Sequence, residues 1–321
     1  ISPLFGRCLA RQCRDILEHL QDGDILELGA GSGKLAVDLL RELGALASLP
    51  RRYLILETSA DLRERQQSLL QEQLPEFYDN IIWLDALPSE PIKGVVIANE
   101  VLDALPVHCI DVTPERATEL TVANADTGFE WQARPLDGQL KTVFDELLEE
   151  LPEPLPNYYR TEVNVGLADW LASVADALAG GVMLFIDYGY PRAEYYHPQR
   201  DTGTLICHYR HRAHQDPFLY PGLQDISTSV EFTRLAEAAL AAGLSVAGFT
   251  TQAHFLLGCG IDSLVNETTT MNERQRMALS REVKQLTLPS EMGERFKVMA
   301  LTREYDPPLA AMQQTDFRHR L

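Results

Sequence analysis

The chain has 321 residues, of which 45% are hydrophobic and 23% are charged. These fractions are typical of globular proteins, and the length exceeds the size at which a single core usually takes on subdomains, so a disordered chain is excluded. The formal net charge is −19, from 47 acidic and 28 basic residues. Because nucleic-acid binding depends on cations that neutralise phosphates, this charge excludes nucleic acid as an expected partner.

Hydropathy and cysteine usage indicate the compartment. No uninterrupted apolar run reaches the roughly 18 residues that a membrane-spanning helix needs, and no basic-then-apolar leader opens the chain. The five cysteines are scattered and odd in number, which favours reduced thiols. We therefore expect a cytoplasmic protein without a membrane span, and the sequence leaves open whether it forms an oligomer.

The first informative segment is DILELGAGSG at positions 24–33. Residues 25–28 read as a short buried strand and residues 34–43 have apolar residues at helical spacing, so the glycines lie in a strand-to-helix turn. Glycine can adopt backbone dihedrals that are closed to other residues, and it lets a ligand lie against bare peptide at a helix N-terminus. Glu57 ends the next expected strand, where a carboxylate can accept hydrogen bonds from two ribose hydroxyls. The segment therefore predicts a nucleoside pocket.

The spacing of the glycines indicates which nucleoside. They follow G-x-G-x-G, with Glu27 two residues before the first glycine, and the dinucleotide pattern G-x-G-x-x-G is not met. This form resembles motif I of class I S-adenosylmethionine-dependent methyltransferases, whose cofactor has a ribose and a charged amino acid but no pyrophosphate. The alternative is a glycine-rich turn in another α/β protein.

Alternating strand and helix patterns continue along the chain and predict an α/β fold with a doubly wound, mostly parallel sheet of seven strands. Helices are expected after the first two strands and before the fifth and sixth, on both faces of the sheet. By analogy with Rossmann-like class I methyltransferases, the last strand is expected to be antiparallel. The predicted strands are 24–29, 52–57, 80–84, 94–98, 182–187, 245–250 and 296–302.

Two insertions interrupt this pattern. Residues 105–165 are predicted to form an inserted α+β cap, and residues 1–104 and 166–321 the methyltransferase core. Within the cap, strands are expected at 107–112, 119–124 and 129–133, with a turn at 126–128 and a helix at 139–150. Residues 191–224 are rich in Tyr, His, Arg, Pro and Gly and lack apolar periodicity, so we interpret them as a long functional loop within the core.

Six segments spread over the chain carry a resemblance to a known family: SPLFG at 2–6, LELGAGSG at 26–33, ANEVLDALPV at 98–107, IDYG at 186–189, PGLQDIS at 221–227 and MGERFKV at 292–298. They resemble the MidA family, and the chain is similar to its bacterial-type members. That family includes the mitochondrial complex I assembly factor that methylates an arginine of a complex I subunit. The resemblance implies transfer of a methyl group from S-adenosylmethionine to an arginine side chain of a protein, with a basic or arginine-bearing segment as partner.

The ANEVLDALPV segment also indicates chemistry directly from its residues. Val95–Ala98 reads as a buried strand, so Asn99 and Glu100 emerge at its carboxyl end, where α/β folds bind ligands. A guanidinium is cationic and a poor nucleophile, and paired carboxylates can hold it by bidentate hydrogen bonds. We predict Glu100 and Asp103 as that catalytic pair. The alternative makes Glu100 a cofactor contact and Asp103 the N-cap of a following turn.

Further site residues follow from strand ends and from the resemblance. Asp85 stands where related enzymes place an acceptor for the adenine amine, or it forms a turn ahead of Pro88. Asp187 and Tyr188 are expected to face the substrate, with a strand-end turn as the alternative for Asp187. The predicted cofactor-binding set is Glu27, Gly29, Ala30, Gly31, Gly33, Glu57, Thr58, Asp85, Ala86 and Asn99.

The side chains of Cys207, His208, His211 and His214 are of types that bind zinc. We predict no metal, because three-residue spacing places the histidines only approximately on one helical face and neighbouring arginines disfavour a dication.

The function that the resemblance implies is protein arginine methylation. A small-molecule methyltransferase, indicated by an enclosed apolar cavity, and a non-catalytic assembly or scaffolding protein, indicated by a blocked glycine turn, are the alternatives.

Overall fold

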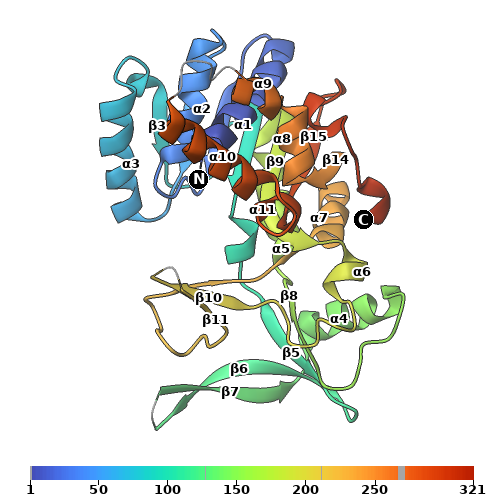
Figure 1. Cartoon of the computed structure of the whole chain (residues 1–321). Coiled ribbons are helices and arrows are strands. Elements are labelled where there is room, and N and C mark those ends of the chain that lie inside the picture. The colour runs from blue at the N-terminus through green and yellow to red at the C-terminus, as the bar shows by residue number, and fades with distance from the viewer. Residues whose placement is uncertain (1, 127, 211, 267–271) are drawn as a thin grey trace. The chain divides into compact units, whose positions relative to one another are not determined.

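The computed structural model describes residues 2–126, 128–210, 212–266 and 272–321 (Figure 1). The chain divides into two compact units. Unit 1 comprises Ile1–Val101, Leu171–Tyr188 and Ala239–Arg320, and unit 2 comprises Leu102–Trp170, Gly189–Ala238 and Leu321. The predicted cap lies within unit 2. Unit 2 also takes in 189–238, so the segment 191–224 that the sequence analysis assigned to the core is part of unit 2.

A central sheet holds unit 1 together, in the strand order β14-β15-β9-β4-β1-β2-β3. Neighbouring strands from β9 to β3 are parallel, whereas β15 is antiparallel to both β9 and β14. Within the described residues, all seven predicted strands and the antiparallel last strand are confirmed, and β13 (Val230–Glu231) is a short eighth strand that pairs with β9. The strand bounds are β1 Asp24–Leu28, β2 Tyr53–Leu56, β3 Ile81–Leu84, β4 Ile92–Asn99, β9 Leu178–Tyr190, β14 Ser245–Thr251 and β15 Phe296–Arg303.

Helices bury both faces of this sheet. Alternate strand residues such as Ile25, Val95 and Leu184 share one core with α1 and α2, and the intervening residues such as Val96 and Met183 are equally buried. This two-sided burial explains why the strands read as continuous apolar runs. The predicted helices are confirmed as α2 Lys34–Ala45, α3 Ala60–Gln73, α5 Leu167–Asp176 and α7 Phe232–Ala241; the others in or near unit 1 are α1 Pro3–Leu20, α8 Gln252–Gly258, α9 Ile261–Asn266, α10 Glu273–Thr287 and α11 Met292–Arg295.

Unit 2 contains an antiparallel sheet in the order β7-β6-β5-β8. Its core lies between one face of that sheet and α4 (Gly138–Glu150), where Ile110, Phe144 and Val163 are buried together. The three predicted cap strands and the helix are confirmed as β5 His108–Val112, β6 Ala117–Ala125, β7 Gly128–Pro135 and α4. β8 (Tyr159–Val163) was not predicted. The predicted turn at 126–128 includes Thr127, which lies outside the described residues.

The segment predicted as a long loop contains regular structure. It includes α6 (Arg192–Tyr195), and β10 (Ile206–Tyr209) pairs with β11 (Arg212–His214) and with β12 (Asp225–Ser227). These strands have only three or four residues, too few for an alternating pattern to stand out in the sequence. In the described part of the chain, no helix is both long and apolar enough to cross a membrane.

Candidate functional site

The glycine turn between β1 and α2 has the backbone that its sequence requires. Gly29, Gly31 and Gly33 have φ values of 63°, 53° and 77°, a region that residues with a Cβ rarely adopt. The Gly29 amide donates to the Leu56 carbonyl at 3.0 Å, which fixes the start of the turn against the end of β2. The turn therefore leads directly into the N-terminus of α2, where backbone N–H groups remain for a ligand.

Space around the turn fits a ligand that lies against the backbone. A Cβ built at Gly31 would meet no described atom within 4 Å, and one at Gly29 would meet only Val101 Cγ2, at 3.5 Å. Bare peptide thus faces open space at Gly31, and at Gly29 a Cβ would make one ordinary van der Waals contact. The turn is therefore not blocked by side chains, whereas a protein that no longer bound the ligand could tolerate a blocked turn. Its open backbone suits the ribose and amino-acid parts of S-adenosylmethionine.

Glu57 lies beside this turn at the end of β2. Its side chain is buried, with 7% of the residue exposed. One carboxylate oxygen accepts a hydrogen bond from the Ser59 amide at 2.9 Å, and the other accepts one from Gln66 Nε2 at 3.0 Å. Each oxygen has a second lone pair, so the carboxylate keeps the capacity to bind two hydroxyls. Thr58, the next residue, is exposed.

Gln66 is a site residue that the sequence analysis missed. Its side chain is fully buried, and its Nε2 donates to the Gly31 carbonyl at 2.8 Å as well as to Glu57. Its Oε1 accepts from Trp83 Nε1 at 3.0 Å. Gln66 therefore ties the glycine turn to Glu57. A signal was present, because Gln66 and the buried Leu70 are four residues apart on the same face of α3.

Arg63, also missed, connects the ends of β2 and β3. Its Nη2 donates to the carbonyls of Glu57 and Leu84 at 3.0 and 2.8 Å, and it pairs with Asp85 Oδ1 at 2.8 Å. Asp85 is held by this ion pair although its side chain is 91% exposed. Ala86 beside it is also exposed. The adenine contact of Asp85 and Ala86 stays a prediction.

Glu27 lies deep in the sheet below the turn. It is 3% exposed, and the Tyr53 hydroxyl donates to its Oε2 at 2.8 Å. Burial raises the pKa of the Glu27 carboxyl to about 7, and the nearby charge of Glu57 acts in the same direction. Ala30, within the turn, is buried as well. Cofactor contacts of Glu27 and Ala30 stay predictions.

Asn99 and Glu100 emerge at the carboxyl end of β4, as the sequence predicted. Glu100 has a φ of 53°, in the left-handed region, and its amide donates to the Ile186 carbonyl at 2.9 Å. Its side chain is exposed and accepts from Asn99 Nδ2 at 3.4 Å. A non-glycine residue in this conformation costs about 1–3 kcal/mol and persists only where the surroundings impose it.

A cavity of about 310 Å³ in unit 1 adjoins Glu100. Its lining combines apolar side chains with amides and hydroxyls. Beside Asn99 and Glu100 the lining residues are Ser2, Phe5, Gln252, Gln285, Leu286 and Met292. Within the cavity wall, Gln252 is 1% exposed and donates to the Leu286 carbonyl at 3.0 Å. The contributions of α1, α8, α10 and α11 were not visible in the sequence, because these helices are far from β4 along the chain.

Asp103 lies in unit 2, within a short 3-10 helix at Leu102–Ala104. It is 9% exposed, and its carbonyl accepts from the Thr228 amide at 3.0 Å. Its predicted catalytic role is treated below as a proposal.

The predicted substrate residues lie at the end of β9. Asp187 is 1% exposed, its Oδ1 accepts from the Tyr188 amide at 2.9 Å, and it stands directly opposite Lys297 in the β9–β15 register. Tyr188 is half-buried and meets Phe296 edge to face, with ring centroids 5.7 Å apart. Contact of Asp187 and Tyr188 with substrate stays a prediction.

Cys207, His208 and His214 lie on strands, whereas the prediction of no metal measured their spacing against a helix. Cys207 and His214 are opposite each other in the β10–β11 pair, and His208 is adjacent to Cys207. His211 lies outside the described residues. Across the ranges that the structure describes, no three His, Cys, Asp or Glu residues are grouped so that they could hold a metal ion. The absence of a metal stays a prediction.

Comparisons with known proteins agree with the motif and the fold. Residues 8–250, more than half of the chain, match the model of a family described as "Putative S-adenosyl-L-methionine-dependent methyltransferase". A crystal structure of a Burkholderia thailandensis protein bound to S-adenosyl-homocysteine has a TM-score of 0.93 and 40% sequence identity, and the match covers 100% of this chain and 81% of that one.

Two curated relatives carry more specific names. The mouse protein arginine methyltransferase NDUFAF7, mitochondrial, is 26% identical over 331 residues, which cover 94% of this chain and 72% of that protein. The Drosophila melanogaster homolog of the same name is 28% identical and covers 86% and 67%. The predicted family and cofactor are confirmed: the chain belongs to this family of methyltransferases that use S-adenosylmethionine.

Proposed function

We propose that this methyltransferase methylates an arginine side chain of a protein substrate. The observation that carries the proposal is Glu100, an exposed carboxylate held in a left-handed backbone conformation at the carboxyl end of β4, beside a cavity. Support also comes from the relatives named protein arginine methyltransferase, which align with 94% of the chain in the mouse case.

S-adenosylmethionine, when bound, supplies the methyl group. The glycine turn and Glu57 are the residues proposed to hold it, with Arg63 and Gln66 fixing their positions. Glu100 is proposed to accept hydrogen bonds from the substrate guanidinium and so to orient one nitrogen for attack. The apolar side chains of Phe5, Leu286 and Met292 would pack against the arginine stem in the adjoining cavity and exclude water.

Asp103 is proposed as the second carboxylate. Two acids bind a guanidinium better than one because each can pair with a different edge of the planar cation and localise charge away from the reacting nitrogen. Asp103 stands three residues after Glu100 in the sequence and is largely buried, as a carboxylate that meets a desolvated cation would be. Its assignment rests on the motif and on this chemistry.

The open glycine turn weighs against the scaffolding alternative, because a Cβ at Gly31 would meet no described atom. The cavity beside Glu100 mixes amides with apolar side chains, so it does not have the uniformly apolar lining that would favour a small-molecule substrate. The first observation supports a protein that can still bind its cofactor, and the second is consistent with a substrate group that is polar.

Labelling with methyl-labelled S-adenosylmethionine tests the proposal. The protein is incubated with the labelled cofactor and a cell lysate, and the modified residue is mapped by mass spectrometry. We expect label on arginine in the wild type, and a rate at least about 30-fold lower in Glu100→Gln, because a desolvated charge pair contributes about 2–5 kcal/mol. Glu72→Gln, which removes an exposed carboxylate on α3, is the matched control. Label on lysine, on a carboxylate or in the small-molecule fraction would refute the proposal.

A further inference from the structure

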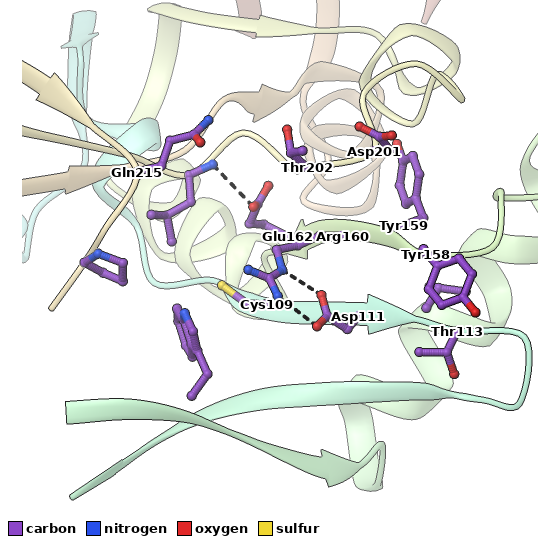
Figure 2. Close-up of a pocket in the computed structure, with 14 residues that line it drawn as sticks. Cys109, Asp111, Thr113, Tyr158, Tyr159, Arg160, Glu162, Asp201, Thr202 and Gln215 are labelled. Carbon is purple, nitrogen blue, oxygen red and sulfur yellow. Dashed lines mark hydrogen bonds and ion pairs between the residues drawn. The ribbon is translucent and has the colours of Figure 1, made fainter. Parts of the chain in front are cut away.

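Unit 2 contains a second cavity, of about 390 Å³, which none of the site residues described above line. Figure 2 shows it on the face of the β7-β6-β5-β8 sheet opposite to α4. Its charged lining residues are mainly acidic: Asp111, Glu162 and Asp201 stand against one basic residue, Arg160. The volume falls at the lower end of the range for ligand pockets, which suits a side chain or a short peptide segment.

The walls of this cavity are held by the chain itself. Glu162 is 1% exposed and accepts hydrogen bonds from the Thr204 amide and hydroxyl, at 2.8 and 2.9 Å, and from the Leu205 amide at 3.3 Å. Gly203 passes so close that a Cβ there would lie 2.2 Å from a Glu162 oxygen. Glu162 therefore fixes segment 201–205 as one wall, and Asp201 and Thr202 are carried on that wall.

The floor of the cavity contains an ion pair whose carboxylate can still accept further hydrogen bonds. Arg160 and Asp111 are directly opposite each other on β8 and β5, and Arg160 Nε and Nη2 donate to the two oxygens of Asp111 at 2.6 and 2.9 Å. Their side chains are 43% and 30% exposed. Each oxygen of Asp111 keeps a further lone pair for a second donor. Asp201 is exposed and adds a second carboxylate that faces solvent.

Aromatic side chains complete the lining. Trp131 on β7 packs against Phe218 with ring centroids 4.9 Å apart, which holds its ring in place. Tyr158 is 75% exposed and has a φ of 62°, so the backbone presents a large aromatic side chain to solvent in a conformation that tyrosine rarely adopts. Carboxylates beside exposed aromatic faces are the combination that binds a guanidinium, by hydrogen bonds at its edge and stacking on its plane.

We propose that this cavity docks an arginine side chain of the protein substrate, apart from the arginine that is methylated. The inference rests on the proposed function for the identity of the partner as a basic protein segment. An arginine would stack on Trp131 or Tyr158 and hydrogen-bond to Asp111 and Asp201. The chain's net charge of −19 would draw basic segments toward the protein before docking.

Binding of a short peptide tests this without any methyl transfer. The probe is an acetylated and amidated pentapeptide with two arginines among glycines, titrated by calorimetry at low salt in the absence of S-adenosylmethionine. The full-length chain carries Glu100→Gln, so that this carboxylate does not contribute. We expect the citrulline version of the peptide, which is neutral and of the same shape, to bind about 10-fold or more weakly, because it lacks the charge for ion pairing and cation–π contact.

Substitutions locate the site. Asp201 is exposed and asparagine has the same shape, so Asp201→Asn should fold normally and lower the affinity for the arginine peptide about 3- to 10-fold. Trp131→Phe should lower this affinity less than Trp131→Ala. Glu149→Gln, which removes an exposed charge from α4, is the matched control and should leave affinity unchanged. Equal binding of the citrulline peptide, or unchanged affinity in Asp201→Asn, overturns the docking proposal. Neither result would contradict the proposed arginine methylation. Conversely, a failure of the methylation experiment would not change what the peptide titration shows.

Discussion

Replacement of Glu57 with alanine tests the proposed cofactor site most directly. The Glu57 carboxylate is buried, and its two oxygens are positioned by the Ser59 amide at 2.9 Å and Gln66 Nε2 at 3.0 Å. Alanine removes the acceptor that we assign to the ribose hydroxyls. Hydrogen bonds to a charged acceptor contribute about 1.5–3 kcal/mol, so S-adenosylmethionine should bind about 10- to 150-fold more weakly.

The isosteric Glu57→Gln variant separates charge from shape. Gln66 Nε2 also donates to the Gly31 carbonyl, and Gln66 Oε1 accepts from Trp83, so this amide cannot turn over without breaking both bonds. In Glu57→Gln the side-chain amide has a single oxygen, so it could accept from only one of the two donors that Glu57 binds, the Ser59 amide and Gln66 Nε2. We expect a loss of cofactor affinity smaller than that of alanine, accompanied by a lower thermal unfolding temperature without ligand.

Calorimetric titration with S-adenosylmethionine and with S-adenosylhomocysteine measures both variants, and thermal unfolding without ligand shows that each is folded. Glu76→Ala removes an exposed carboxylate after α3 and serves as control. A folded Glu57→Ala protein that binds the cofactor as the wild type does would contradict the assignment. So would a wild type that binds a nicotinamide dinucleotide more tightly than S-adenosylmethionine.

Three further predictions follow from the charges of the site and of unit 2. Asp103→Asn should retain cofactor binding but lower the methylation rate at least about 30-fold, as expected for Glu100→Gln. Wild-type rates in both variants would refute the proposal that these two carboxylates bind the substrate guanidinium. Burial raises the pKa of Glu27 from 4.5 to about 7, so the stability that its protonated form contributes is complete below pH 4.5 and is lost as the pH rises through 7. Glu27→Gln, which stays neutral, should therefore gain stability over the wild type as the pH rises from 4.5 to about 7, by at most about 1.4 kcal/mol per pH unit in urea unfolding, and a pH-independent difference would refute this. Elemental analysis of purified protein should find no stoichiometric zinc at residues 207–214, and one zinc per chain would overturn that expectation.

Local sequence was sufficient for the central sheet and for the glycine turn that we assign to the cofactor. The seven strands are runs of apolar residues buried on both faces, and such runs are visible without knowledge of neighbouring strands. Gly29, Gly31 and Gly33 were identifiable because their φ values are a property of single residues at a turn. Glu57 and Glu100 followed from the rule that parallel strands end at the same edge of a sheet.

The tertiary structure alone decided which side chains support that site. Gln66 contacts Gly31, 35 residues away, and Arg63 contacts Leu84, 21 residues away. The helical pattern of α3 shows only that one of its faces is buried and does not show which residues that face contacts. The sequence likewise gave no sign that Asp187 stands opposite Lys297, because pairing between distant strands depends on register.

The same reason explains the errors in unit 2. β8 and the strands at 206–214 are short and were missed, because their stability comes from partners that are far along the chain rather than from their own periodicity. The proposed docking cavity is built from β5, β7, β8 and segments 201–205 and 215–217, which no local pattern connects. Local sequence patterns determined the fold, the family and the conformation of the glycine turn, whereas long-range packing of short elements determined the cavity that we propose as a docking site.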